Sequence, residues 1–216
     1  MQRLTQVFGW VDFPRPLFYE AEFALRFELG GELPMGPRRF LQAMDRARAV
    51  ASALFAKADR LTVATSYMGR RLTPAIPAKL RQALGDTEVQ IADAQSFRPP
   101  PRDSNDLENA AEGWYRFIWT FDIRNDDSQI LPFLWASVAN EMPISPRFPV
   151  LAGSYIMDLT NGVMLVVYDD RGMDAAAVEP ELLRPSYEKF NSWLLDHDRP
   201  LMDAMFADPD TNSRDA

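Results

Sequence analysis

The segment Tyr168–Asp174 carries the densest group of side chains that could do chemistry in this chain. It reads Tyr-Asp-Asp-Arg-Gly-Met-Asp and follows directly on an apolar run. Charged groups at the end of a buried strand can pair with one another, bind an ion or contact a partner. Its polar side chains are therefore candidate binding residues: Tyr168, Asp169, Asp170, Arg171 and Asp174.

Two interpretations of this acidic box are open. Asp169, Asp170 and Asp174 could offer oxygen ligands to a hard cation such as Mg²⁺, and a catalytic metal would also need an open position for water or substrate. Aspartate is equally a turn residue, because its carboxylate accepts hydrogen bonds from nearby backbone amides, and Gly172 permits the chain to reverse. The spacing does not match a Ca²⁺-binding loop. Turn chemistry favours the structural interpretation, and no metal ligand is assigned.

In the structural interpretation Arg171 needs an acidic partner. The segment Phe18–Leu29 alternates between apolar and polar residues, which predicts a half-buried strand. Its polar face holds a second candidate binding set: Glu20, Glu22, Arg26 and Glu28. We expect Arg171 to form a bidentate pair with one of these glutamates.

The second set has alternatives of its own. An open face would be ordinary solvated surface, whereas a covered face would be a buried polar network. An acid–base pair would need two of its carboxylates in a cleft with separated pKa values. The pattern favours the solvated surface.

Other catalytic constellations are missing from the sequence. There is one histidine and no cysteine, which excludes cysteine nucleophiles and ordinary histidine-based zinc sites. His197 is predicted to be an exposed connector, with Asp198 as the N-cap of a helix that includes Pro200. No Gly-x-Ser-x-Gly elbow or phosphate-cradling glycine loop is present. We therefore assign no catalytic residue and predict no cofactor.

The charge balance bears on partners. The 216-residue chain has a formal net charge of −8 and a pI of about 4.7. Nucleic-acid binding depends on neutralising phosphates, so an acidic chain without a basic patch is not expected to bind nucleic acid. A basic protein partner fits better. The sequence shows no secretory signal and no run long enough to cross a bilayer, so we expect a cytoplasmic protein without a membrane partner.

The elements that would position these residues follow from periodicity. The firmest is a hairpin around Thr160-Asn161-Gly162, because Asn-Gly supplies the positive φ of a tight turn. Phe8, Trp10 and Phe13 either hold the N-terminus on the core or offer an exposed apolar contact. The predicted strands are 18–29, 60–67, 88–94, 114–123, 154–159 and 163–168. The predicted helices are 37–56, 77–84, 126–140, 180–195 and 200–206.

Together these elements predict an α+β fold. The sheet is largely antiparallel with about five to six strands, helices pack on it, and the C-terminus is helical. We expect a single domain over residues 1–207 with a frayed polar tail over residues 208–216. Three consecutive prolines at 99–101 predict an extended loop.

Two parts of the chain resemble a known family. The N-terminal part holds Pro-Leu-Phe-Tyr at 16–19 and Leu-Arg-Phe-Glu-Leu-Gly at 25–30. The C-terminal part holds Val-Tyr-Asp-Asp-Arg-Gly-Met-Asp at 167–174 and Tyr-Glu-Lys-Phe-Asn-Ser-Trp-Leu-Leu-Asp at 187–196. They resemble a bacterial domain of unknown function marked by the Tyr-Asp-Asp-Arg-Gly box, whereas residues 73–102 match no family. The family has no established reaction and implies no catalytic residues.

Three functional hypotheses follow. The first is a non-enzymatic protein-binding domain, such as an immunity or inhibitor protein that neutralises a basic toxin domain by charge complementarity. The second is a metal-dependent hydrolase or nucleotide-handling enzyme that uses Asp169, Asp170 and Asp174. The third is a structural or regulatory module in which the box locks the C-terminal helices onto the sheet.

Overall fold

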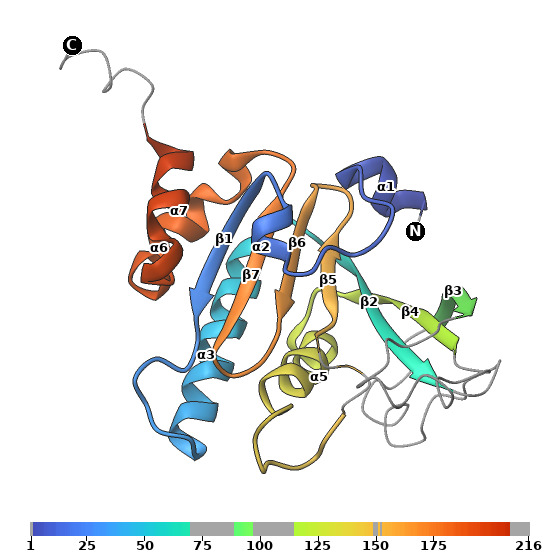
Figure 1. Ribbon diagram of the computed structural model, residues 1–216, viewed down its shortest axis with the longest axis horizontal. Helices are drawn as coiled ribbons and strands as arrows, with labels where there is room; N and C mark the ends of the chain where they lie inside the picture. The colour runs from blue at the N-terminus through green and yellow to red at the C-terminus, as the bar shows by residue number, and fades with distance from the viewer. Residues whose placement is uncertain (1, 70–88, 97–114, 149–150, 152, 208–216) are drawn as a thin grey trace, which may run out of the picture.

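The computed structural model describes residues 2–69, 89–96, 115–148, 151 and 153–207, and within them the chain builds one seven-stranded sheet (Figure 1). The strand order is β1-β7-β6-β5-β2-β4-β3, and every neighbouring pair is antiparallel. The α+β prediction is confirmed, with one strand more than expected. The strands are β1 (Phe23–Glu28), β2 (Arg60–Gly69), β3 (Val89–Ser96), β4 (Tyr115–Arg124), β5 (Tyr155–Asp158), β6 (Val163–Val167) and β7 (Gly172–Ala177).

The unexpected strand is β7. Its six residues are all buried, and it lies between β1 and β6 in the sheet. Its sequence, Gly-Met-Asp-Ala-Ala-Ala, lacks the β-branched and aromatic residues typical of strands. Pairing with β1 and β6 on its two sides keeps β7 extended. Because β6 and β7 pair antiparallel, the acidic box contains the turn of a β6–β7 hairpin.

The β5–β6 hairpin is confirmed. Asp158 pairs with Val163 across the turn. Between them Gly162 adopts a φ of 72°, and the Asp158 carboxylate accepts hydrogen bonds from the backbone N–H groups of Thr160 and Asn161. The turn is therefore held by its own local side chains, as its composition predicts.

One face of the sheet is covered by α3 (Pro37–Leu54) and α5 (Asp127–Val138), which lie behind it in Figure 1. The predicted helix at 37–56 is thereby confirmed, and α5 begins directly after Asp126. The apolar side of α3 packs on the sheet because Phe40, Ala43, Ala47 and Val50 recur at helical spacing. Fully buried aromatic side chains fill the layer between helices and sheet: Phe27, Phe55, Trp119, Phe121 and Phe133.

The N-terminal segment crosses the other face. It contains α1 (Gln2–Phe8) and α2 (Leu17–Glu20), and α2 lies in front of β1 and β7 in Figure 1. The prediction that a strand begins at Phe18 is wrong. Leu17 and Phe18 are both buried, which a helical turn permits and an extended strand with one covered face does not.

Aromatic side chains hold this segment in place. Phe8 stacks on Trp10 with ring centroids 5.2 Å apart, and Phe13 packs against Tyr155 at 4.6 Å. All three N-terminal aromatics are partly buried against the core. The structure therefore supports the alternative in which these aromatic residues hold the N-terminus on the core.

The C-terminal segment folds beside the edge strand β1 (Figure 1). Its helices are α6 (Arg184–Lys189) and α7 (Arg199–Phe206), joined by single 3₁₀ turns. The continuous helix expected over 180–195 is wrong: an antiparallel bridge from Phe27 to Leu194 and a hydrogen bond from Leu195 N–H to the Arg26 carbonyl draw this stretch onto β1. Helix α7 confirms the helix predicted over residues 200–206.

Some predictions fall outside the described residues. They are the helix at 77–84, the proline loop at 99–101, most of the segment 73–102 and the tail at 208–216. The assignment of residues 1–207 to a single domain stays a prediction. Among the described helices none is long and apolar enough to span a bilayer.

Candidate functional site

The acidic box forms the tight connection between β6 and β7. Tyr168 N–H donates to the Gly172 carbonyl at 3.3 Å, and Leu29 N–H donates to the Arg171 carbonyl at 2.8 Å. Gly172 is needed for space rather than for a reversed backbone angle: a Cβ there would lie 2.2 Å from the Tyr168 hydroxyl oxygen and 2.8 Å from the Phe27 carbonyl. The Tyr168 side chain therefore lies flat across the start of β7.

The three aspartates of the box are buried and do not converge. Each one pairs with an arginine of its own. The pairs are Asp169 with Arg171, Asp170 with Arg39, and Asp174 with Arg26. In the part of the chain that the structure describes, no group of three or more acidic or histidine side chains is arranged to hold a metal ion.

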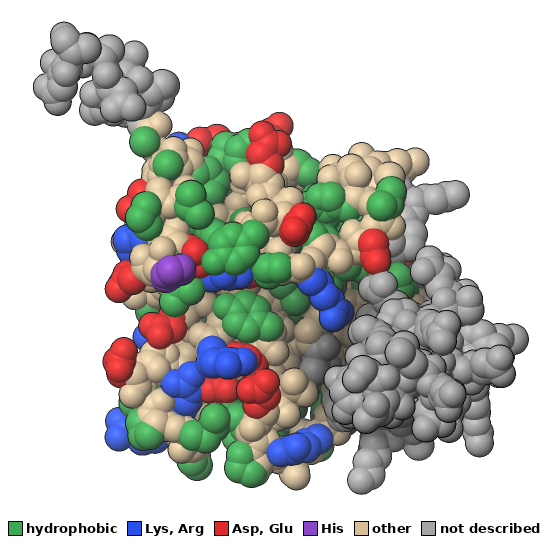
Figure 2. Space-filling model, in the orientation of Figure 1, with side chains coloured by type: hydrophobic (Ala, Val, Ile, Leu, Met, Phe, Trp, Pro, Cys, Tyr) green, Lys and Arg blue, Asp and Glu red, His purple; other side chains and the backbone are tan. Residues whose placement is uncertain are grey.

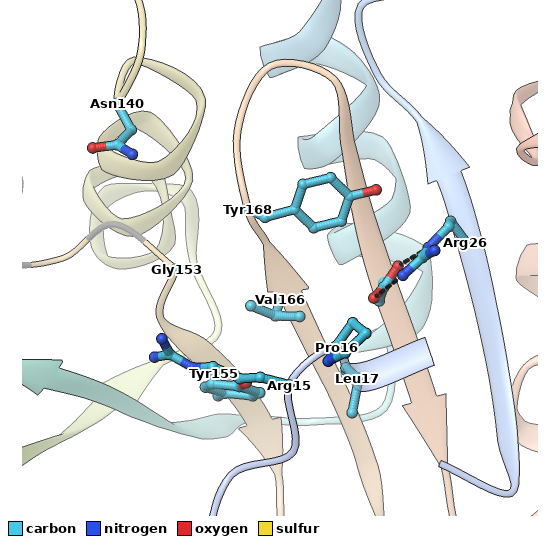
Figure 3. A pocket seen from close by; sticks show the side chains of 10 residues that line it. Arg15, Pro16, Leu17, Arg26, Asn140, Gly153, Tyr155, Val166 and Tyr168 are labelled. Carbon is cyan, nitrogen blue, oxygen red and sulfur yellow. Dashed lines mark hydrogen bonds and ion pairs between the residues drawn. The ribbon is translucent and has the colours of Figure 1, made fainter. Parts of the chain in front are cut away.

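Arg26 is the centre of the most extensive network. Its Nε and Nη2 donate to the two oxygens of Asp174 at 2.8 and 3.1 Å (Figure 3), and its Nη1 donates to Asp198 at 3.2 Å. Phe18 N–H also donates to Asp174, at 3.1 Å, and the Tyr19 hydroxyl donates to Asp198 at 3.0 Å. The Arg26 guanidinium lies 4.8 and 4.7 Å from the centroids of the Phe18 and Tyr19 rings. The network therefore joins α2, β1, β7 and the C-terminal segment.

Two predictions are corrected here. The Arg26 side chain is only 12% exposed, so the polar face of β1 is not simply solvated. Burial lowers the pKa of the Arg26 guanidinium, but the hydrogen bond and charge of Asp174 outweigh it and raise that pKa overall. Asp198 stands at the N-cap of α7 but makes no capping bond with its side chain, because that side chain is held by Arg26 and Tyr19. His197 is exposed, as expected.

The expected pairing of Arg171 with a glutamate of the first strand is wrong. The Arg171 side chain is 65% exposed and pairs with Asp169 and, at 3.6 Å, with Glu141. Of the three proposed partners, Glu20 and Glu22 are exposed and Glu28 is half-buried. The ion pair between the box and the first strand exists with the roles reversed: the strand supplies the arginine and the box supplies the aspartate.

Arg39 is a site residue that was not predicted from the sequence. Besides its pair with Asp170, its Nη1 donates to the carbonyls of Gly31 and Leu33 at 2.8 and 2.9 Å. A Cβ on Gly30 would lie 2.4 Å from the guanidinium carbon of Arg39. Arg39 thus connects the β1–α3 loop to the acidic box. The adjacent glycines Gly30 and Gly31 in that loop were the sequence feature that could have indicated a close contact there.

A pocket of about 640 Å³ opens beside this network (Figure 3). The Arg26–Asp174 pair and Tyr168 lie on one side of it, Arg15 and Tyr155 lie on the other, and Leu17 and Val166 lie between them. The residues come from the N-terminal segment, β1, β5, β6 and the box. Arg15 and Tyr155 were not predicted, because only the tertiary fold brings them to the box.

Both tyrosines of the pocket keep their protons. Burial raises the pKa of the Tyr155 hydroxyl, against the lowering effect of the nearby Arg15 charge, and this hydroxyl donates to the Pro14 carbonyl at 2.6 Å. Burial, followed by the Asp174 charge, raises the pKa of the Tyr168 hydroxyl. Tyr168 is therefore a neutral hydrogen-bond donor at physiological pH.

Tyr19 and Tyr168 remain exposed near Arg26, by 55% and 37%. Both lie close enough to act on the Arg26 charge, and exposed Glu20 and Glu22 follow Tyr19 in the chain. We call the surface formed by Tyr19, Arg26, Tyr168, Glu20 and Glu22 the tyrosine face. Figure 2 shows hydrophobic side chains grouped on this side of the molecule, with basic and acidic side chains between them.

Comparison with known proteins gives a family but no activity. A family model described as "Domain of unknown function (DUF3885)" matches residues 1–198. The "Uncharacterized protein YnaE" of Bacillus subtilis (strain 168) is 27% identical over 90 residues, which are 40% of this chain and 42% of that protein. The match thus spans less than half of that relative. No solved structure matches the chain.

Proposed function

The chain belongs to the DUF3885 family of domains of unknown function, and we propose that it is a non-catalytic domain that binds another protein through the tyrosine face. The single observation that carries this proposal is the exposure of Tyr19 and Tyr168 around an arginine that the fold already holds rigid. Tyrosine and arginine are enriched among the residues that dominate binding energy at interfaces. A preorganised group loses less conformational entropy when a partner arrives.

The charge of the surface indicates the kind of partner. Glu20 and Glu22 are exposed beside Tyr19, and the chain as a whole carries a formal charge of −8. A basic partner would be steered to such a surface, with faster association and lower affinity at high salt. An immunity or inhibitor protein that masks a basic bacterial toxin domain would use its charge in this way.

The other two hypotheses fare differently. A metal-dependent hydrolase would need Asp169, Asp170 and Asp174 to leave three arginines and turn toward one ion, at the cost of breaking buried pairs. The structural role of the box is compatible with protein binding, because the arginine pairs hold the tyrosine face in shape. We therefore propose the box as a scaffold and the exposed tyrosines as the contact surface.

The test begins with the proteins encoded next to this chain. Each is co-expressed with the full chain, and a stable complex is sought by size-exclusion chromatography. Growth rescue is then measured for any neighbour that is toxic alone. We expect one neighbour to form a complex and to lose its toxicity.

Variants locate the contact. Tyr19→Ala should weaken the complex, and Glu22→Lys should slow association and reduce its dependence on salt. Glu32→Lys is the matched control, because this exposed glutamate lies beyond the opposite end of β1 and should leave binding unchanged. A complex that tolerates Tyr19→Ala and Glu22→Lys as well as it tolerates the control would refute the tyrosine face, and the absence of any complex or rescue would refute the partner.

A further inference from the structure

The pocket beside the tyrosine face has its acceptors occupied. Asp174, the one carboxylate that the described residues contribute to its lining, already accepts hydrogen bonds from Arg26 Nε, Arg26 Nη2 and the Phe18 amide. Its charge is balanced by the bidentate contact with Arg26. A ligand cation would therefore have to displace an arginine from a buried pair, which is costly.

The pocket also holds hydrogen-bond donors. Arg15 lies along Tyr155 at one edge of the cavity (Figure 3), and its guanidinium interacts with the Tyr155 hydroxyl. No carboxylate among the described residues forms an ion pair with that guanidinium, so its other N–H groups can still bind an anion. On the opposite side the Tyr168 hydroxyl makes no hydrogen bond with the described residues and keeps its proton. The side-chain amide of Asn140 at the rim is a third group able to donate.

The remaining lining is apolar. Leu17 and Val166 lie between the two polar sides, with Pro16 next to Leu17 (Figure 3). A volume of about 640 Å³ lies in the range that holds small organic ligands, which are usually bound by apolar walls and a few placed polar groups. Among the described lining residues, two arginines stand against one aspartate, so this part of the lining is positive although the chain is acidic overall.

We propose that this pocket binds a small organic anion, a carboxylate or phosphate joined to an apolar body of about the size of one ring. The anionic group lies on Arg15, whose planar guanidinium forms paired, charge-assisted hydrogen bonds with such oxygens. The apolar body lies against Leu17, Val166 and the ring of Tyr168. This inference does not rest on the proposed protein partner, because every residue that it uses belongs to the described part of this chain.

The experiment titrates the purified full chain with benzoate and with phenyl phosphate by isothermal calorimetry. Benzyl alcohol and benzylamine are the neutral and cationic comparisons of the same ring. We expect saturable binding of one molecule of benzoate or phenyl phosphate per chain. The probe with the higher affinity identifies whether the pocket prefers a carboxylate or a phosphate. Neither comparison compound should bind.

Variants test the assigned roles. Arg15→Gln should weaken anion binding by about tenfold or more, since a hydrogen bond to a charged group is lost, and Tyr168→Phe should weaken it less. Arg38→Gln is the matched control, because Arg38 is an exposed arginine on α3. Unchanged melting temperatures show that the variants are folded.

Three results would overturn the inference: no saturable binding of either anion, equal binding of benzylamine, or full affinity in Arg15→Gln. None of them bears on the protein partner, which is tested by complex formation without added ligand. Anion binding without any protein complex would leave the pocket in place and remove the proposed partner.

Discussion

Replacing Arg26 with alanine tests the central contact of the structure. The change removes three charge-assisted hydrogen bonds at 2.8, 3.1 and 3.2 Å. It leaves the carboxylates of Asp174 and Asp198 without their arginine, although their side chains are only 1% and 4% exposed. Removing one partner of a buried pair costs about 3–5 kcal/mol, because the remaining charge stays buried.

The expected loss for Arg26→Ala is a large share of the total free energy of unfolding. Domains of this kind unfold with a free energy of about 5–15 kcal/mol. Urea unfolding of the full chain, followed by tryptophan fluorescence and far-ultraviolet circular dichroism, measures the loss. With a slope of about 2 kcal/mol per molar urea, the midpoint should fall by roughly 2 M.

A second variant separates the ion pair from the packing of the long side chain. Arg26→Met keeps much of the apolar contact with Phe18 and Tyr19, and adding Asp174→Asn removes the unpaired charge. The double variant should therefore lose less free energy than the sum of the two single losses. A loss below about 1 kcal/mol for Arg26→Ala, the level of a surface ion pair, or strict additivity in the cycle would refute the reasoning.

Three further predictions concern the acidic box. Arg171→Ala should cost less free energy of unfolding than Arg26→Ala, because the Arg171 side chain is 65% exposed and the buried Asp169 carboxylate keeps its hydrogen bond from the backbone N–H of residue 171; a loss as large as that of Arg26→Ala in the same urea assay would contradict this. Gly172→Ala should cost about 1–3 kcal/mol in thermal unfolding, since its Cβ would meet the Tyr168 hydroxyl and the Phe27 carbonyl, and adding Tyr168→Phe should restore only part of the loss. The raised pKa of Tyr168 means that the folded state holds this proton more tightly than the unfolded state, so its contribution is complete below about pH 10 and is lost as the pH rises further. Melting temperatures measured across that range should therefore fall less steeply in Tyr168→Phe than in the parent chain, and equal slopes would contradict the assignment.

Local features of the fold could be predicted because their causes lie within a few residues. The Asn161-Gly162 turn carries its own positive φ and its own carboxylate acceptor in Asp158. Helix α3 carries its apolar stripe at helical spacing and begins at Pro37. In both cases the physical determinants are contiguous in the chain.

For the site, the sequence predicted which groups interact but not which residues pair with each other. The box and the polar face of β1 were identified as interacting groups, but Arg26 and Asp174 lie 148 positions apart, and no local pattern selects Asp174 over the neighbouring carboxylates. Arg15 and Tyr155 meet only through tertiary structure. Strand β7 was missed because its alanines are extended by two flanking strands rather than by their own preference.

The pairing of β1 with β7 has a consequence for how this protein is made. The first described strand in chain order bonds to the last, with Phe23 opposite Ala177, so β1 cannot pair with β7 until residues 172–177 have been synthesised. Nascent chains that stop before Gly172 would expose the backbone edges of both β1 and β6, and such edges invite pairing with other chains. A polypeptide with this strand order completes its sheet late, and we expect chaperones to hold it during elongation.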